Sequence, residues 1–523
     1  MGAEDGAQSP SVAANGVVAV ACVVTAASMT LSASTDYILQ PMADDFNVDS
    51  DHASLLKLAP TLATILIVFV AGVLGDRLGH RRAISWATVT FLIGCGLTAL
   101  APTVAVLVAA LSITAAATSV MTIVAIALLS ASVTGTATRA RAFGTLGVVG
   151  PLVYVVVPVL AGAMVTWLDW RLIIILWVLL GILALWMTRH ILTADESERS
   201  TGELLTPILG GIVLVLGTQA LNRLGEDGPF ATITLVVTGA TGATALILWV
   251  VHRRMADPTL SYEPIRHIRS LMLLVVCALI PLTSMWFTAY LVFQYLFGLN
   301  PVEISLILIP AQAAGIVGAK AMPRLIIARG LRTAALVGFG ALLVAELSFL
   351  LAGTESLVLV GVLMTLYGLV TGALSVAIAN VVMNAAPSGE VGAMASYRAA
   401  ASRIGGALAS VLIASLALGT YHTSIGDRAR DAGLDPEEAG VTAAYLADQI
   451  AGSDESASIT LPPADEVTAI SDIQQWAILD ALRTKSLAGA AIAASGGLML
   501  AWTMRRRRDE AAPDQDVPAP SAG

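Results

Sequence analysis

The charged residues that lie inside long apolar stretches of this sequence are the ones best placed to do chemistry. Asp36 and Glu346 are acids that could take up and release a proton, whereas Arg398 and Arg403 are cations that could bind an anion. Charge at membrane depth is costly and usually serves a function. These four residues are therefore candidates for proton coupling or for contact with a charged solute.

Some of these positions also allow a structural interpretation. Asp36 and Lys57 lie towards the same side of adjacent apolar stretches, so they could form an ion pair or outer gate instead of a proton site. Arg398 and Arg403 are separated by about 140° around a helix, so both cannot face one cavity squarely. We expect one arginine to bind backbone carbonyl groups or a gate, and the other to meet an anionic group.

No arrangement typical of an enzyme, a metal site or a nucleotide-binding site is found. The six histidines are scattered without ligand spacing, and no phosphate-binding glycine loop is present. Cys22, Cys95 and Cys277 all lie in apolar stretches and are expected to be packing residues. We expect no enzymatic activity, no cofactor, no metal and no nucleic-acid partner.

The composition indicates that most of the chain faces lipid. Of its 523 residues 57% are hydrophobic and only 12% are charged, whereas a soluble protein carries about 25% charged residues. Apolar stretches of about 20 residues cross a bilayer as helices. Fourteen are predicted, at approximately 16–40, 54–74, 82–101, 104–132, 143–166, 171–192, 205–223, 230–251, 270–296, 302–323, 333–352, 356–385, 392–418 and 478–503.

The connections between these stretches alternate in charge. One set carries most of the arginines, from Arg77 to the final run 505–508, and the other set is short or acidic. Positive charge marks cytoplasmic loops, so both termini are predicted to be cytoplasmic, which requires an even number of spans. We expect a multi-pass protein of the bacterial cytoplasmic (inner) membrane, surrounded by membrane lipids and functional as a monomer.

The connection 419–477 is the one long insertion on the opposite side, and it is acidic. Between residues 421 and 475 it has eleven acidic residues and two arginines. Asp435 is a suitable N-cap for a helix that begins at Pro436, and a second amphipathic helix leads into the last span. The insertion could be a solvated cap or a vestibule that attracts cations.

The segment "GVLGDRLGHRRAI", residues 72–84, closes the second predicted span. Gly72 and Gly79 allow close backbone approach and a tight turn. Asp76 can accept hydrogen bonds from the N-terminus of a neighbouring helix, where the dipole favours an anion. The segment resembles the loop motif between spans two and three of the major facilitator superfamily. The resemblance implies that Gly72, Asp76, Arg77, Gly79 and Arg81 govern conformational switching.

Fourteen spans resemble the drug:proton antiporter branch of that superfamily, and "DWRLIII", "FQYLFGLNPVEISLILIPAQAAGI" and "SGEVGAMASYRAAASRIGGALASVLIASL" resemble its segments. The implied fold is an all-α polytopic membrane protein, with two six-helix bundles and two extra transmembrane helices between them. The predicted parts are a tail at 1–15, a bundle at 16–192, linker helices at 193–253, a bundle with the acidic insertion at 254–504, and a tail at 505–523.

The sequence departs from the branch where its coupling motifs are expected. Ser32 stands at the usual aspartate of span one, Leu111 near the usual arginine of span four, and Ser396 and Arg398 at frequent acid positions of span thirteen. Glu346 lies in a span that packs peripherally in the superfamily, so structural pairing is favoured for it over proton coupling. The resemblance also implies apolar and aromatic cavity residues, with helix packing as the alternative for each: Tyr37, Tyr154, Met285, Trp286, Tyr290, Gln294, Tyr367, Asn380 and Asn384.

Three functions follow as hypotheses. The resemblance favours a secondary active transporter, a proton-coupled exporter of amphiphilic or drug-like small molecules that works by alternating access and uses the proton gradient as its energy source. Arg398 and Arg403 favour export of an anionic or lipid-like molecule. The acidic insertion is compatible with a membrane sensor or scaffold that transports nothing.

Overall fold

The computed structural model describes residues 10–46, 48, 50–133, 135–192, 203–255, 258–354, 356–387, 389–451 and 462–510. These residues form α-helices and one short 3₁₀ helix, without strands. The helices are α1 (Pro10–Asp45), α2 (Ser50–Leu66), α3 (Val68–Leu78), α4 (His80–Ala99), α5 (Val104–Ser132), α6 (Thr136–Trp167), α7 (Leu172–Ile191), α8 (Leu205–Glu226), α9 (Thr232–Arg254), α10 (Glu263–Arg266), α11 (Ile268–Leu282), α12 (Trp286–Tyr295), α13 (Pro301–Arg329), α14 (Leu331–Ser348), η1 (Phe349–Leu351), α15 (Leu357–Met383), α16 (Val391–Asp431), α17 (Pro436–Ala451) and α18 (Ala464–Glu510). The predicted tails lie largely outside the described residues.

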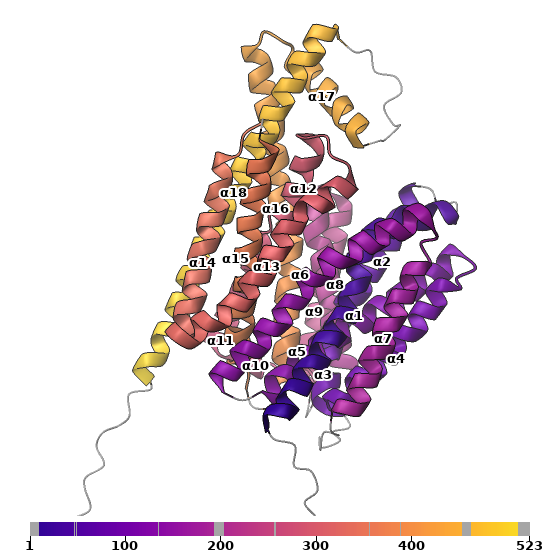
Figure 1. Ribbon diagram of the computed structural model, residues 1–523, viewed down its shortest axis with the longest axis vertical. Coiled ribbons are helices and arrows are strands. Elements are labelled where there is room, and N and C mark those ends of the chain that lie inside the picture. Colours follow the sequence, from indigo (N-terminus) through magenta and orange to yellow (C-terminus); the bar gives the residue numbers. More distant parts are fainter. Residues whose placement is uncertain are drawn as a thin grey trace, which may run out of the picture.

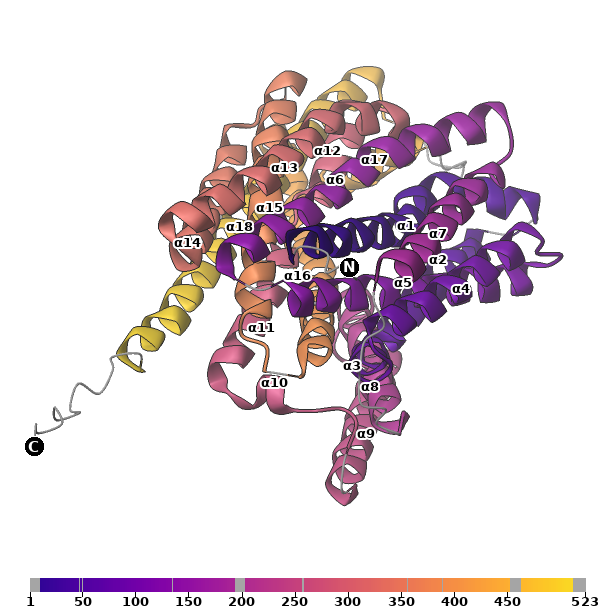
Figure 2. The same cartoon turned by 60° about the horizontal axis from the view of Figure 1, so that its bottom comes forward.

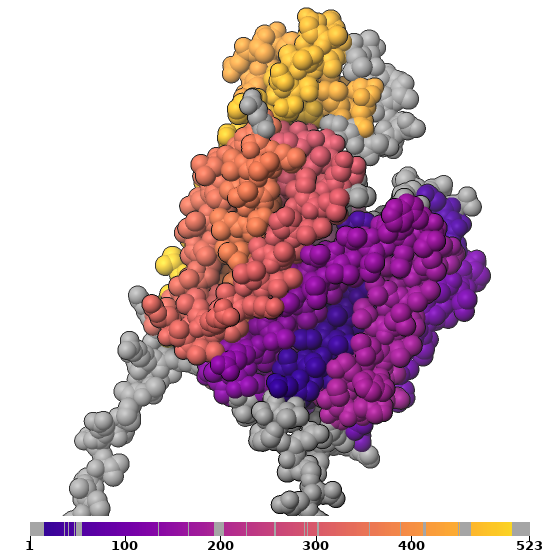
Figure 3. All heavy atoms as spheres, in the orientation of Figure 1, coloured from indigo at the N-terminus to yellow at the C-terminus, as the bar shows by residue number. Residues whose placement is uncertain are grey.

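The helices form two groups that stand side by side. Figure 1 shows α1, α2 and α4 to α7 on one side, and α11 to α15 with α18 on the other. We assign α3 to the first group because it continues α2 and packs against α5, and α16 to the second because it packs against α11 and α18. Figure 2 shows α9 at the edge of the molecule, and α8 packs between α9 and the helices α2, α3 and α16. The space-filling view shows the two groups in contact along an oblique seam (Figure 3). We call the face where α1 begins and α18 ends the terminal face, and the opposite one the hairpin face.

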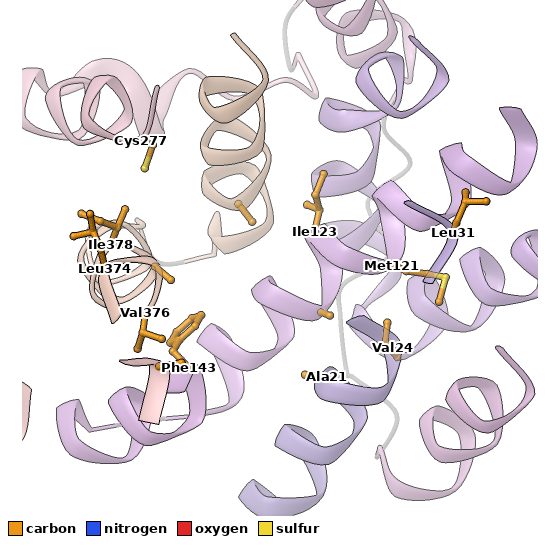
Figure 4. Packing of buried hydrophobic residues seen from close by; sticks show 14 of the residues in the cluster. Ala21, Val24, Leu31, Met121, Ile123, Phe143, Cys277, Leu374, Val376 and Ile378 are labelled. Carbon is orange, nitrogen blue, oxygen red and sulfur yellow. The ribbon is translucent and has the colours of Figure 1, made fainter. Parts of the chain in front are cut away.

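Small residues let the helices approach one another closely. At Gly318 of α13 an added Cβ would lie 2.0 Å from the Leu369 carbonyl oxygen of α15, and at Gly368 it would lie 2.0 Å from the Ala311 carbonyl oxygen. Such contacts are typical of helix pairs in membranes. Figure 4 shows the same tight packing between the two groups, where Phe143 of α6 lies beside Val376 of α15.

Eleven of the described helices are long and apolar enough to cross a membrane, or twelve if the bent pair formed by α2 and α3 is one span. The predicted second span is not a single straight helix, because it bends by 43° near Ile67. The predicted span 270–296 is likewise interrupted, since α11 ends at Leu282 and α12 begins at Trp286. The structure thus confirms an all-helical membrane fold, but it does not establish the count of fourteen.

The acidic insertion continues the helices on either side of it. The helices do not end at the predicted limits of 418 and 478, because α16 runs on to Asp431 and α18 begins at Ala464. Ile425, Ala429 and Ile470 form a small separate core with α17. Asp435 caps α17 by accepting a hydrogen bond from the Glu437 amide at 2.8 Å, as predicted. Figure 1 shows this helical hairpin standing above the second group.

Candidate functional site

Asp76, at the end of α3, binds the N-terminus of α16 and so joins the two helix groups. Its Oδ1 accepts a hydrogen bond from the Gly392 amide at 2.8 Å, and its Oδ2 accepts one from the Ala393 amide at 2.9 Å. The first turn of a helix has unsatisfied N–H groups and a partial positive charge, which favour a carboxylate. The predicted interaction of Asp76 with a helix N-terminus is therefore confirmed.

Two glycines allow this contact. A Cβ on Gly72 would lie 2.4 Å from the Gly392 carbonyl oxygen, and a Cβ on Gly392 would lie 2.6 Å from the Gly72 carbonyl oxygen. Ser396 adds a third link, because its hydroxyl donates to the Val68 carbonyl oxygen at 2.8 Å. The backbones of α3 and α16 are thus in direct contact where the helices cross, with no room for a side chain at either glycine. We call this contact the α3–α16 seal.

The remaining motif residues shape the turn that follows. Gly79 joins α3 to α4 with a φ of 78°, which favours glycine. Arg81 donates to the carbonyl oxygen of Arg189, at the end of α7, at 2.8 Å. Arg77 lines a pocket at the terminal face between α3 and the segment 258–266. A second link across the groups joins Arg139 of α6 to the side chain of Asn384.

A cavity of about 540 Å³ lies on the hairpin side of this seal. Its wall comes from α1, α2, α3, α5 and α6 of the first group and from α16 of the second. Along α1 the lining extends from Ser28 to Met42, and along α2 from Leu56 to Thr64. These segments run from the middle of the helices towards their hairpin-face ends, so the cavity lies on the side opposite to the closed seal.

The described side chains of this cavity are cationic or neutral. Arg403 of α16 and Lys57 of α2 are the charged residues of its described lining. Tyr154 and several hydroxyls add polar surface, and seven of the eight Ser and Thr hydroxyls lie within hydrogen-bond distance of backbone carbonyl oxygens. The Ser and Thr residues of the wall are Ser28, Ser32, Thr35, Thr61, Thr64, Thr118, Ser119 and Thr122.

The predicted site residues are distributed over several environments. Arg403 and Tyr154 line the cavity, whereas Arg398 lies on the part of α16 near Cys277 of α11. Tyr37 of α1 hydrogen-bonds to Ser305 of α13, across the groups. The side chains of Asp36 and Tyr290 lie outside the described part of the structure, so the predicted Asp36–Lys57 pair is not described.

The other predicted cavity residues lie in the second helix group and do not contribute to the 540 Å³ cavity. Met285, Tyr367 and Asn380 are buried, and the Asn380 amide donates to the Val376 carbonyl oxygen of its own helix at 2.9 Å. Trp286 packs edge-on against Tyr367, with ring centroids 6.2 Å apart. Gln294 is half-buried on α12.

Glu346 has a partner that the sequence analysis did not single out. Lys485 of α18 places its Nζ 3.2 Å from Oε2 of Glu346, and the two side chains are 1% and 0% exposed. Arg483 and Lys485 lie near the start of the predicted span 478–503 and resemble an ordinary charged boundary. The signal in the sequence was therefore weak, although Lys485 stands seven residues inside that span.

Together these features define a class of protein. Apolar helices that could cross a membrane surround a polar cavity, and that cavity is closed at one face by contacts between two helix groups; this is the design of a multi-pass membrane transporter. Residues 19–410 match the family model described as Major Facilitator Superfamily. The chain belongs to this superfamily and is a transporter, not an enzyme.

Solved structures share the fold. The human organic anion transporter MFSD10 (TETRAN) aligns with a TM-score of 0.59 at 13% identity, over 93% of this chain and 99% of that one. The proton:xylose symporter XylE, bound to 6-bromo-6-deoxy-D-glucose, aligns with a TM-score of 0.57 at 12% identity, over 80% and 91%. A bacterial homologue of the iron transporter ferroportin in an outward-facing state aligns with a TM-score of 0.55 at 12% identity, over 94% and 100%. The comparison with curated proteins finds no match.

Proposed function

We propose that this protein is a secondary active transporter that exports amphiphilic small molecules by alternating access. The observation that carries the proposal is the pairing of a closed α3–α16 seal with a cavity on its far side. A volume of about 540 Å³ falls within the range of about 300–1,000 Å³ that is typical of small-molecule sites.

In this proposal the terminal face is cytoplasmic, and the cavity opens to the outside. Arginines gather at the terminal face, in agreement with the positive-inside rule. The full set of spans is fourteen, which adds α11 with α12 and α16 to the twelve helices or bent pairs that pass the length and composition test. The protein acts as a monomer in a bacterial inner membrane, and the proton gradient drives it through Asp36 or Glu346.

The cavity favours an anionic amphiphile over a cationic drug as the substrate. Arg403 places positive charge in the wall of the cavity. Leu39, Met42 and Ile123 offer apolar surface to the hydrocarbon part of such a substrate. The alternative, an exporter of cationic drugs, requires the acid at Asp36 to face the substrate.

Transport into proteoliposomes with an imposed pH gradient tests both the charge of the substrate and the coupling to protons. The probes are a fluorescent fatty acid, as the anionic amphiphile, and ethidium, as the cation. We expect gradient-driven transport of the fatty acid, and we expect Arg403→Gln to reduce its kcat/KM by about 10- to 100-fold, as for a buried charge-assisted contact. Arg223→Gln, which removes a half-exposed arginine outside the cavity, is the matched control.

The results separate the alternatives. If ethidium is transported in preference to the fatty acid, and Arg403→Gln leaves that transport unchanged, the substrate is cationic and not anionic. If a protonophore does not reduce the transport of either probe, the transport is not coupled to protons. If neither probe is transported, deletion of residues 427–470 distinguishes a scaffold, which loses its cellular role, from a transporter of another substrate.

A further inference from the structure

The helix that contains α11 and α12 is broken within the second helix group. Residues 283–285 separate the two helices. The Thr283 and Ser284 amides donate to backbone carbonyl oxygens of α11, and the Met285 carbonyl oxygen accepts from α12. The Thr283 carbonyl oxygen and the Met285 amide have side-chain partners instead, as backbone groups at membrane depth must be satisfied within the protein.

Two side chains satisfy the backbone at this break. The Tyr367 hydroxyl of α15 donates to the Thr283 carbonyl oxygen at 2.7 Å and accepts from the Met285 amide at 3.1 Å. Lys485 of α18 donates to the same Thr283 carbonyl oxygen at 3.1 Å. Lys485 thus holds the break from one side, and Tyr367 holds it from the other.

Glu346 of α14 supplies the counter-charge that keeps the Lys485 ammonium in place. Its two carboxylate oxygens lie 3.4 and 3.2 Å from Nζ, and both side chains are fully buried. Gly489 makes room for the carboxylate, because a Cβ there would lie 2.5 Å from Oε2. Within the described chain, the charged and titratable groups that face Glu346 are Lys485 and Tyr367.

A single proton changes this balance. When Glu346 takes up a proton, the carboxylate becomes a neutral acid, and Lys485 becomes a buried ammonium without a counter-charge. A buried charge that loses its partner is strongly unfavourable. The Lys485 ammonium avoids this cost if it moves out of its buried position and away from Thr283. The break then loses one of its two side-chain partners.

We propose that Lys485 is a positioning residue that stabilises the backbone at the α11–α12 break, and that this stabilisation depends on the protonation state of Glu346. The structure carries the proposal through the shared contacts of Lys485 with Glu346 and Thr283. Because α18 is one helix from Ala464 to Glu510, the same contact ties the extramembrane hairpin to the break. This role rests on the proposed function only in its use of the proton gradient.

Hydrogen exchange of the purified protein in lipid nanodiscs tests this inference without a substrate. The amides of residues 282–290 are compared at about pH 8 and about pH 5, after correction for the intrinsic exchange rate. We expect exchange to be about tenfold faster at the lower pH, as for local opening around an unpaired buried charge. Asp227→Asn, which removes an acid from an exposed pair on α8, should keep this response.

Two variants make the outcome decisive. Glu346→Gln should exchange fast at both pH values, and the neutral pair Glu346→Gln with Lys485→Met should show no pH response even if the single variant folds poorly. A wild-type response below about twofold, or an unchanged response in the neutral pair, overturns the proposal. Failure of transport in proteoliposomes would instead overturn the proposed function, and it would leave the exchange result standing.

Discussion

The Asp76 carboxylate accepts a hydrogen bond from the Gly392 amide at 2.8 Å, although 316 positions separate the two residues in the sequence. The contact joins the end of α3 to the start of α16 and so connects the two helix groups. In the proposed alternating-access cycle it holds only while the terminal face is closed, because the two groups separate there when the cavity changes sides. Its strength therefore biases the equilibrium between the two conformations.

Asp76→Asn should open the terminal face. The amide keeps one acceptor oxygen and loses both the second acceptor and the charge, at a cost of about 1–2 kcal/mol. Nitroxides attached at Arg141→Cys of α6 and Arg324→Cys of α13, which line one pocket at this face, report the separation by electron–electron double resonance. The native cysteines are replaced beforehand. An unchanged distance distribution would show that Asp76 does not control closure.

Gly392→Ala should prevent closure more completely. The new methyl group would lie 2.5 Å from Asp76 Oδ1 and 2.6 Å from the Gly72 carbonyl oxygen, and such overpacking costs about 1–3 kcal/mol. The same nitroxide pair should show mainly the separated population, and transport should fall. Gly96→Ala is the control, because a Cβ there meets nothing within 4 Å. A closed terminal face in Gly392→Ala would contradict the backbone contact described above.

Breaking the Glu346–Lys485 pair on one side should cost more stability than removing both charges. Glu346→Gln leaves a buried ammonium, for which losses of about 3–5 kcal/mol are typical, whereas a neutral pair of similar volume is often close to wild type. Thermal unfolding of the two single variants and of Glu346→Gln with Lys485→Met gives a double-mutant cycle. Additive losses would mean that the two charges do not interact.

Asp45 should contribute to stability in a pH-dependent way. Hydrogen bonds from Trp170 and Arg171 hold the pKa of this carboxyl below its ordinary value of 3.8. A lowered pKa in the folded state stabilises the protein above the ordinary value, and the contribution is lost as the pH falls through the folded value. The Tm difference between wild type and Asp45→Asn should be constant above about pH 5 and shrink below about pH 4. The effect is small because Asp45 is exposed to solvent, and a difference that grows in acid would contradict it.

The sequence by itself determined the class of the fold and the polarity of its faces. Long apolar stretches predict membrane helices because each stretch need only match the lipid around it. The motif at residues 72–84 predicted the contact of Asp76 with a helix N-terminus. Asp435 was found for a similar reason, since an N-cap needs only its own first turn. Each of these features depends on neighbours along the chain or on a fixed spacing.

Only the tertiary structure decided which distant side chains meet. Glu346 and Lys485 are 139 positions apart, and neither residue alone indicates which face of its helix packs inward. The same limit applies to Arg398 and Arg403, because only the packing of α16 shows that Arg403 faces the cavity. The helix break near Ile67 also depends on packing, since apolar residues continue through it, whereas Pro281, Thr283 and Ser284 mark the second break in the sequence. In a chain whose apolar residues surround every helix, hydrophobic pattern does not distinguish lipid-facing from buried sides, and contacts between helices must supply that information.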